Sequence, residues 1–161
     1  MKINIGVISD THLSQPSPDL LELMGDVFSD VSMVFHAGDI TRISVLEAFS
    51  EKEVFAVSGN MDQYDVVDTL PSERVIQVGG HRIGLIHGWG SRDLVEDRVM
   101  GRFSNVDAIV YGHTHRAANH LKNNILFFNP GAFSGSSISG RKRSVGVLSI
   151  NDGVTGRIIN I

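Results

Sequence analysis

The sequence contains no cysteine, which excludes several kinds of chemistry at once. Without thiols the chain cannot form disulfides, iron–sulfur clusters or thiolate zinc sites, and it cannot use a cysteine nucleophile. It also lacks an excess of positive charge, since 14 Lys and Arg stand against 18 Asp and Glu. The resulting net charge of −4 disfavours generic nucleic-acid binding and attraction to anionic membranes. Any metal chemistry must use nitrogen and oxygen ligands, for which seven histidines are available.

Long apolar runs are absent as well. No stretch approaches the ~18 residues that a membrane-spanning helix needs. Met1 and Lys2 lead directly into a strand-like run, without the apolar segment of a secretion signal. We therefore expect a cytoplasmic location without membrane association. The length of 161 residues predicts a single domain over residues 1–161, which is large enough to form its own core.

The first half of the chain alternates strand and helix signals. Apolar runs at 3–8, 33–35 and 53–57 predict strands, and apolar residues at helical spacing predict helices at 20–28 and 43–49. This order implies parallel strands joined by helical crossovers. An α/β fold is therefore expected.

The second half is richer in strand signals. Runs at 74–78 and 81–86 flank Gly79-Gly80 and predict a hairpin, and a helix is predicted over 91–103. Further strands are predicted at 108–111, 118–121, 125–128, 145–150 and 155–159. Glycine and serine crowd 134–140, which is typical of a loop. We expect this half to be mostly antiparallel.

Metal-competent side chains follow five of the predicted strands. In chain order they are Asp10 and His12, Asp39, Asn60, His87, and finally His113 and His115. Open α/β sheets bind ligands beyond the carboxyl ends of their strands, so these side chains are expected to converge. Each short motif alone is more typical of a turn or a helix cap, but their order at successive strand ends favours a site.

Two carboxylates, one amide and four imidazoles are too many ligands for one catalytic ion with open positions. They suit two ions that share a bridging carboxylate. Mixed imidazole and oxygen ligands favour Mn²⁺, Fe²⁺, Ni²⁺ or Zn²⁺ over an all-oxygen Ca²⁺ or Mg²⁺ site.

These motifs carry a resemblance to a known family. Asp-x-His, Gly-Asp, Gly-Asn, His-Gly and Gly-His-x-His, in that order, resemble the motifs of the calcineurin-like metallophosphoesterases. The short chain, Gly59-Asn60-Met61-Asp62 and Asn129-Pro130-Gly131 resemble its small bacterial and archaeal phosphodiesterase branch. The resemblance covers residues 3 to about 134. It implies a four-layer sandwich of two mixed β-sheets flanked by helices.

The resemblance also implies a site and a reaction. One ion would be held by Asp10, His12, Asp39 and His115, and the other by Asp39, Asn60, His87 and His113, with Asp39 bridging. Mn²⁺ is the expected metal. Small phosphodiesters would be hydrolysed by in-line attack of a metal-bridging hydroxide, with Asp39, Asn60 and His87 carrying the catalysis. His36 and Asp62 occupy no ligand position and would orient the ligands or the backbone.

One position departs from the family pattern. Many relatives place a histidine directly after the Gly-Asn asparagine, where it can protonate the leaving oxygen. Met61 stands there and cannot donate a proton. We therefore expect weak activity on esters with poor leaving groups, unless Asp62, the substrate or water supplies the proton.

Two other functions compete with the phosphodiesterase interpretation. The retromer scaffold subunit resembles this fold and acts mainly through protein contacts, with an incomplete metal set. A metal-dependent amide or lactone hydrolase would need a His-x-His-x-Asp-His run, which is missing. The complete set of seven ligands favours the enzyme. The sequence leaves the physiological substrate, the metal used in the cell and the oligomeric state open.

Overall fold

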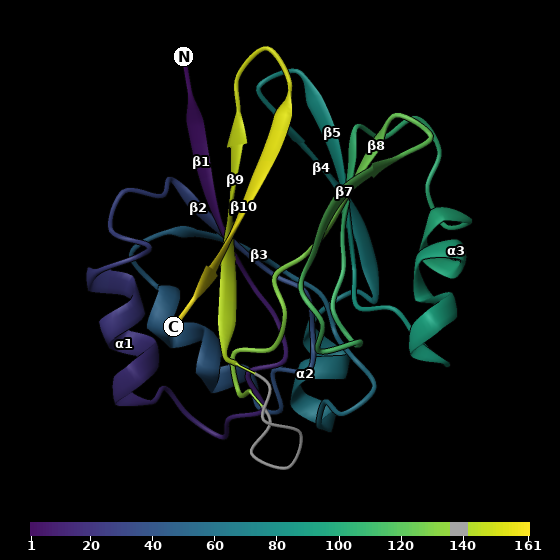
Figure 1. Ribbon diagram of the computed structural model, residues 1–161. Helices are drawn as coiled ribbons and strands as arrows, with labels where there is room; N and C mark the ends of the chain where they lie inside the picture. The colour runs from purple at the N-terminus through teal and green to yellow at the C-terminus, as the bar shows by residue number, and fades with distance from the viewer. Residues whose placement is uncertain (136–141) are drawn as a thin grey trace.

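Two five-stranded β-sheets face each other in the computed structural model, which describes residues 1–135 and 142–161 (Figure 1). The first sheet has the strand order β10-β9-β1-β2-β3. Neighbours β1, β2 and β3 are parallel, as the sequence predicts, and β9 pairs antiparallel with β1 and β10. The bounds are β1 (Ile3–Ile8), β2 (Met33–His36), β3 (Glu53–Ala56), β9 (Ser144–Ile150) and β10 (Val154–Asn160).

The second sheet has the order β4-β5-β6-β8-β7. The predicted hairpin is confirmed: β4 and β5 are antiparallel, and the turn residues Gly79 and Gly80 have φ angles of 55° and 84°. The pairing of β7 with β8 is also antiparallel, but β5, β6 and β8 are parallel, so this sheet is evenly mixed rather than mostly antiparallel as expected. The bounds are β4 (Glu73–Val78), β5 (His81–Ile86), β6 (Ala108–Val110), β7 (Ala118–Lys122) and β8 (Ile125–Asn129).

The alternation of side chains along β1 explains why this sheet is buried on both faces. Ile5 and Val7 lie in the core between the two sheets, together with Leu85 of β5 and Phe128 of β8. Ile8 points to the other face, where it joins the apolar cluster under the helices. Successive side chains of a strand point to opposite faces, so the continuous apolar run at 3–8 fills two cores.

Helices cover the outer face of each sheet (Figure 1). On the first sheet they are α1 (Pro18–Gly25), the 3₁₀ helix η1 (Ile43–Phe49) and α2 (Tyr64–Thr69), which bury Leu20, Phe49 and Val66. On the second, the 3₁₀ helix η2 (Arg92–Leu94) leads into α3 (Val95–Met100), which buries Val95 and Val99. The molecule therefore has four layers, helix–sheet–sheet–helix, and the expected sandwich is confirmed.

Three helical segments differ from the sequence prediction. The segment 43–49 is helical, but it is a 3₁₀ helix. The helix predicted over 91–103 is split at Leu94, whose φ of −113° and ψ of 6° interrupt it, and it ends at Met100 before a glycine. Helix α2 was not predicted, because its six residues give no helical repeat and include β-branched valines of low helix propensity.

Most of the loop predicted at 134–140 lies outside the described residues. Among the residues described, no helix combines the length and the apolar character that crossing a membrane requires.

Candidate metal centre

The loops that carry the predicted ligands are joined to one another by backbone hydrogen bonds. The amide of Asp10 donates to the carbonyl of Gly38 at 3.0 Å, and the amide of His12 donates to the carbonyl of Asp39 at 3.1 Å. On the second sheet, the amide of Gly112 donates to the carbonyl of His87 at 3.0 Å. The loops after β1 and β2, and those after β5 and β6, are thereby fixed in pairs.

Five of the seven predicted ligands have a left-handed backbone. Their φ angles lie between 49° and 67°, for Asp10, His12, Asp39, His113 and His115. Positive φ is uncommon for residues other than glycine, although Asp, Asn and His tolerate it best. Backbone strain of this kind clusters at functional sites, where the surrounding structure holds it in place.

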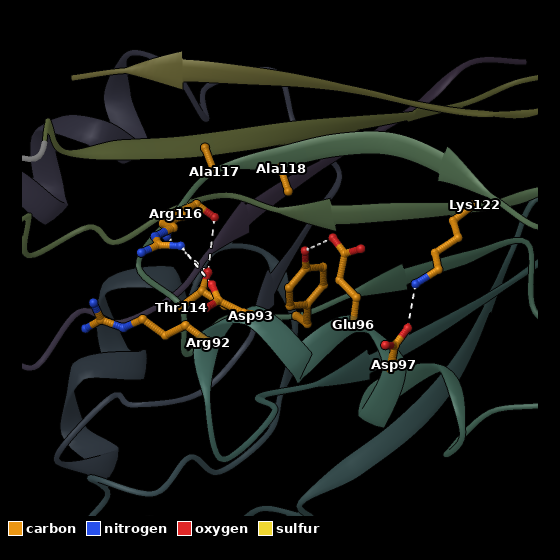
Figure 2. A pocket seen from close by; sticks show the side chains of 10 residues that line it. Arg92, Asp93, Glu96, Asp97, Thr114, Arg116, Ala117, Ala118 and Lys122 are labelled. Carbon is orange, nitrogen blue, oxygen red and sulfur yellow. Dashed lines mark hydrogen bonds and ion pairs between the residues drawn. The ribbon is translucent and has the colours of Figure 1, made fainter.

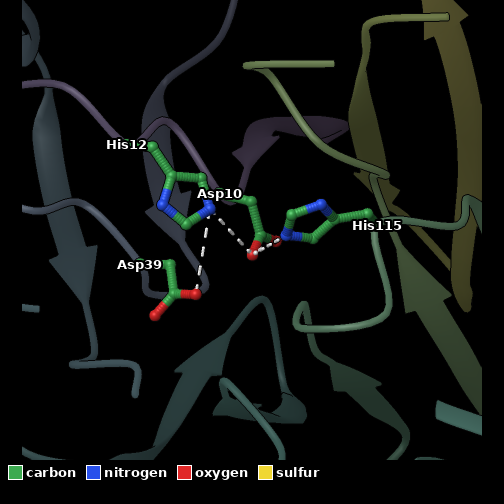
Figure 3. A group of neighbouring side chains, drawn as sticks. All are labelled: Asp10, His12, Asp39 and His115. Atoms are coloured by element: carbon green, nitrogen blue, oxygen red, sulfur yellow. Dashed lines mark ion pairs between the residues drawn. The ribbon is translucent and has the colours of Figure 1, made fainter. Parts of the chain in front are cut away.

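The first group of side chains comes together around Asp10. Ligand atoms of Asp10, His12, Asp39 and His115 all lie within 4.8 Å of one another. Figure 3 shows the rings of His12 and His115 on either side of the Asp10 carboxylate, with His12 also facing Asp39. The Nε2 atom of His115 lies 3.0 Å from Asp10 Oδ1, and Nε2 of His12 lies 3.8 Å from both carboxylates.

Two polar atoms of this group are buried without a hydrogen-bond partner among the described residues. They are Oδ1 of Asp10 and Nε2 of His12. Leaving such atoms unsatisfied is costly, whereas a divalent cation would satisfy both. This cluster therefore fits a metal ion on the chemistry of its own donors.

The second group surrounds the side-chain oxygen of Asn60. Oδ1 of Asn60 lies 3.1 Å from Nε2 of His87 and 3.0 Å from Nδ1 of His113. His87 Nε2 also lies 3.2 Å from Oδ2 of Asp39. Asp39 therefore contacts both groups, as the prediction of a bridging carboxylate requires.

Backbone carbonyls fix which nitrogen of each ring faces this second group. Nδ1 of His87 lies 2.7 Å from the carbonyl oxygen of Ala37, and Nε2 of His113 lies 2.8 Å from that of Gly90. A carbonyl only accepts hydrogen bonds, so each of these nitrogens carries a proton. In the neutral rings, the opposite nitrogens then direct lone pairs at the Asn60 oxygen. In that state, a cation between the three atoms would be held by all of them.

Burial and charge act against each other at the centre. Burial raises the pKa of Asp10, but the facing imidazoles of His115 and His12 outweigh it and hold that pKa well below its usual value. Burial likewise raises the pKa of Asp39, and the contact with His87 more than reverses this. Burial lowers the pKa of His87, yet Asp39 and Asp10 raise it overall. Both carboxylates thus stay ionised and favour positive charge beside them.

A glycine allows the two groups to approach each other. A Cβ atom at Gly59 would collide with Oδ1 of Asp39 and would lie 2.9 Å from Cδ2 of His87. Only hydrogen fits at this position, directly before Asn60. The Gly-Asn motif therefore reflects close packing of the loop against the central carboxylate.

His36 and Asp62 support the site from outside. Asp62 accepts hydrogen bonds from the amides of Thr41 at 2.6 Å and Gly59 at 2.7 Å, which ties the loops after β2 and β3 together. His36 accepts from the amide of Gly38 through Nδ1, so its Nε2 donates to the hydroxyl of Thr11. Burial lowers the pKa of His36 to about 3, which keeps this ring neutral.

Three groups that position the predicted ligands were not evident from the sequence. The hydroxyl of Ser9 donates to Asp10 Oδ2 at 2.6 Å, and its place beside Asp10 is the one signal that the sequence offered. The carbonyls of Ala37 and Gly90 orient His87 and His113. Every residue has a backbone carbonyl, so the sequence does not indicate which carbonyls orient these rings.

A separate cavity of about 250 Å³ lies between α3 and β7 (Figure 2). Its charged side chains largely pair with each other: Lys122 with Asp97 at 2.6 Å, and Arg116 with Asp93 at 3.4 Å. Tyr111 donates to Glu96 at 2.5 Å, and this bond adds to burial in raising the pKa of the phenol. None of the proposed metal ligands lines this cavity, so the candidate centre does not depend on it.

Comparison with known proteins agrees with the geometry. The chain is 34% identical over 161 residues to a probable metallophosphoesterase of Methanocaldococcus jannaschii, covering 98% of this chain and 81% of the relative. Its fold matches that of an archaeal phosphodiesterase with a TM-score of 0.77 at 22% identity, over 99% of this chain and 100% of the other. It also matches Vps29 of Entamoeba histolytica, solved with Zn²⁺, with a TM-score of 0.74 at 23% identity, over 98% and 99% of the two chains.

A family model matches almost the whole chain and not only the short ligand motifs. Residues 3–153 match the calcineurin-like phosphoesterase superfamily domain, a range that includes every predicted ligand and every strand except β10. The chain therefore belongs to the calcineurin-like phosphoesterase superfamily.

Proposed function

We propose that the protein is a phosphoesterase that uses two divalent metal ions, and that its substrates are small phosphodiesters. The observation that carries this proposal is the set of unsatisfied ligand atoms at the centre. Asp10 Oδ1 and His12 Nε2 have no hydrogen-bond partner among the described residues, and His87 and His113 direct ring nitrogens at Asn60 Oδ1. A cation in each group would satisfy these atoms together.

The two groups divide the ligands between two ions. One ion would be held by Asp10, His12, Asp39 and His115, and the other by Asp39, Asn60, His87 and His113. When bound, such ions supply an activated water and positive charge against the phosphoryl oxygens. We propose Mn²⁺ as the metal, with Fe²⁺, Ni²⁺ and Zn²⁺ as alternatives, because the donors mix imidazole with oxygen.

The role of Asp39 follows from its two oxygens. Oδ1 accepts a hydrogen bond from the amide of Met61 at 2.8 Å, which fixes the carboxylate. Oδ2 faces His12 at 3.8 Å and His87 at 3.2 Å, one from each group. Asp39 would therefore contribute to holding both ions, and Asp10 and His87, which are buried, would each contribute to one of them.

The charges beside the centre favour a phosphodiester over a phosphomonoester. A monoester dianion is commonly held by free guanidinium groups, because they donate two parallel hydrogen bonds. The two arginines that closely follow ligand loops are already paired, Arg42 with Asp65 at 3.2 Å and Arg116 with Asp93 at 3.4 Å. A singly charged diester makes a smaller demand for additional cations.

A second candidate function is that of a protein-interaction scaffold, which the similarity to the Vps29 fold keeps open. A scaffold has no chemical need for seven converging ligands or for rings oriented by backbone carbonyls. We therefore favour the enzyme. The cytoplasmic location remains a prediction of the sequence.

Hydrolysis of bis(p-nitrophenyl) phosphate with added Mn²⁺ tests this proposal. We expect turnover that exceeds that of p-nitrophenyl phosphate and that is lost in Asp39→Asn. Thr155→Val, on β10 and remote from the ligand loops, serves as the control and should retain activity. Absence of turnover with Mn²⁺, Fe²⁺, Ni²⁺ and Zn²⁺ alike would favour the scaffold.

A further inference from the structure

A polar cavity of about 300 Å³ lies beside the candidate centre. Its lining residues are Ser14, Thr41, Arg42, Ser44 and Gln63. Three of them carry hydroxyl groups, one carries an amide and one a guanidinium, so every lining side chain can form hydrogen bonds. Among the described residues no apolar side chain lines it, which distinguishes it from a site for an aromatic or lipid group.

The position of this cavity follows from the ligand loops. Ser14 comes two residues after His12, and Thr41 comes two residues after Asp39. The loops run side by side here, because the amide of Leu13 donates to the carbonyl of Ile40 at 3.0 Å. Two residues span at most about 7 Å of chain. The cavity is therefore within reach of one arm of a phosphodiester whose phosphate is held at the centre.

The backbone of Thr41 is held in an unusual conformation at this place. Its φ of 88° is rare for a β-branched residue. The carboxylate of Asp62 accepts the Thr41 amide at 2.6 Å, and the Thr41 carbonyl accepts the amide of Gln63 at 3.1 Å. Strain that neighbouring groups hold in place points to a function for the strained residue. Here the same contacts bring Thr41 and Gln63 to one cavity.

The polar groups of Thr41 and Gln63 are available to a ligand. Neither the Thr41 hydroxyl nor the Gln63 side-chain amide bonds to another of the described residues, and Gln63 is exposed. The hydroxyl of Ser44 donates to the carbonyl of Ser14 at 3.0 Å, which leaves its oxygen able to accept. The cavity therefore offers both donors and acceptors, as a hydroxyl group requires.

The charge of the cavity argues against a second phosphate. Nε of Arg42 lies 3.2 Å from Oδ2 of Asp65, so the one cation in the lining is balanced by a carboxylate. An additional anion would have to compete with Asp65 for the guanidinium. A neutral polyol would use its remaining N–H groups without that competition.

We propose that this cavity binds a hydroxyl-bearing arm of the substrate, so that the preferred phosphodiesters carry a polyol such as glycerol or a sugar. This inference rests on the proposed phosphodiesterase function and names its substrate class. Thr41 and Gln63 are the residues that select the arm, through the hydroxyl and the amide that they present.

Competition between matched diesters tests the inference. Ethyl p-nitrophenyl phosphate serves as the reporter substrate, and glyceryl methyl phosphate and propyl methyl phosphate serve as competitors. The glyceryl and propyl arms each have three carbons and differ only by two hydroxyl groups. Inhibition is measured because it reports binding of the competitor and does not depend on which of its arms would leave. We expect an inhibition constant at least about tenfold lower for the glyceryl compound. In Thr41→Val and in Gln63→Met the ratio of the two constants should fall toward one.

Thr155→Val is the matched control, because it makes the same change on β10 and should keep the tenfold ratio. Equal inhibition by both competitors in the native protein would overturn the inference while the proposed function stood. A competitor with a phosphate in place of the terminal hydroxyl that binds more tightly than the glyceryl compound would also overturn it. Failure to hydrolyse the reporter at all would contradict the proposed function itself.

Discussion

His87 and Ala37 join the two sheets at the candidate centre, because Nδ1 of His87 donates to the carbonyl oxygen of Ala37 at 2.7 Å. His87 follows β5 in the second sheet, and Ala37 follows β2 in the first. The bond leaves Nε2 of His87 facing Asn60 and Asp39. A single hydrogen bond thus orients a predicted ligand and links two halves of the molecule.

Removal of the His87 ring should abolish metal binding by the group around Asn60. In His87→Ala the group around Asn60 loses a ligand, while Asp10, His12, Asp39 and His115 remain. We expect bound Mn²⁺ to fall from about two ions per chain to about one, with loss of phosphodiester hydrolysis. The unpaired Ala37 carbonyl should also lower the free energy of unfolding by about 1–3 kcal/mol.

Metal analysis of the purified variant and denaturant unfolding measure these two effects. His120→Ala is the matched control, since His120 is exposed and contacts Glu96 at 3.1 Å, away from the ligands. Retention of two ions by His87→Ala would contradict the assignment of His87 as a ligand.

A methyl group at residue 59 should disturb the bridging carboxylate. In Gly59→Ala the new Cβ would collide with Asp39 Oδ1, so the carboxylate must move. We expect at least about a tenfold loss of kcat/KM, or about 1.4 kcal/mol of transition-state stabilisation. Gly25→Ala is the control, because a Cβ there meets no atom within 4 Å. Equal activities of the two variants, measured with the same diester, would show that close packing at Gly59 is unimportant.

The buried ring of His36 should make stability depend on pH in a defined direction. Its pKa is lowered from 6.5 to about 3 by burial, so between these values the unfolded chain binds a proton that the folded chain does not. The contribution of His36 is therefore present above pH 6.5 and is lost as the pH falls toward 3. In His36→Gln this dependence should disappear.

The difference in unfolding free energy between the native protein and His36→Gln should change by about 1.4 kcal/mol per pH unit across that range. Denaturant unfolding of the metal-free protein, in the presence of a chelator, measures it. Because every other titrating group is common to both proteins, their contributions largely cancel. Parallel stability curves from pH 6.5 to pH 4 would show that His36 is protonated in the folded state.

Met61 should make the rate sensitive to the leaving group. Both Asp62 oxygens accept backbone amides, from Thr41 and Gly59, so this carboxylate serves the loops rather than the leaving oxygen. For ethyl aryl phosphodiesters, kcat/KM should fall steeply as the pKa of the leaving phenol rises. Met61→His should make the dependence shallower. A flat dependence in the native protein would reveal another proton donor.

The sequence was sufficient to predict the strands and to select side chains that converge in the structure. Strand-end positions and glycine-containing motifs identified Asp10, Asp39, Asn60 and His87, and the structure brings these residues together. This succeeded because apolar periodicity marks the ends of buried strands, and parallel strands present those ends at one edge of a sheet.

What the sequence did not predict depends on the backbone and on long-range packing. The carbonyl of Ala37 orients His87 across 50 residues, and every residue type carries a carbonyl. The positive φ of Thr41 depends on Asp62, which lies 21 residues away. Helix α2 is short, and the burial of Val66 under the first sheet stabilises it more than its own helix propensity does.

Direct titration of the metal-free protein with Mn²⁺ tests the central claim, that the converging side chains form a centre for two ions. Calorimetry or elemental analysis should give two ions per chain in the native protein and about one in His87→Ala. Phosphodiester hydrolysis should appear only as the second ion binds. A stoichiometry below one ion per chain, with no hydrolysis at saturating Mn²⁺, would contradict the account.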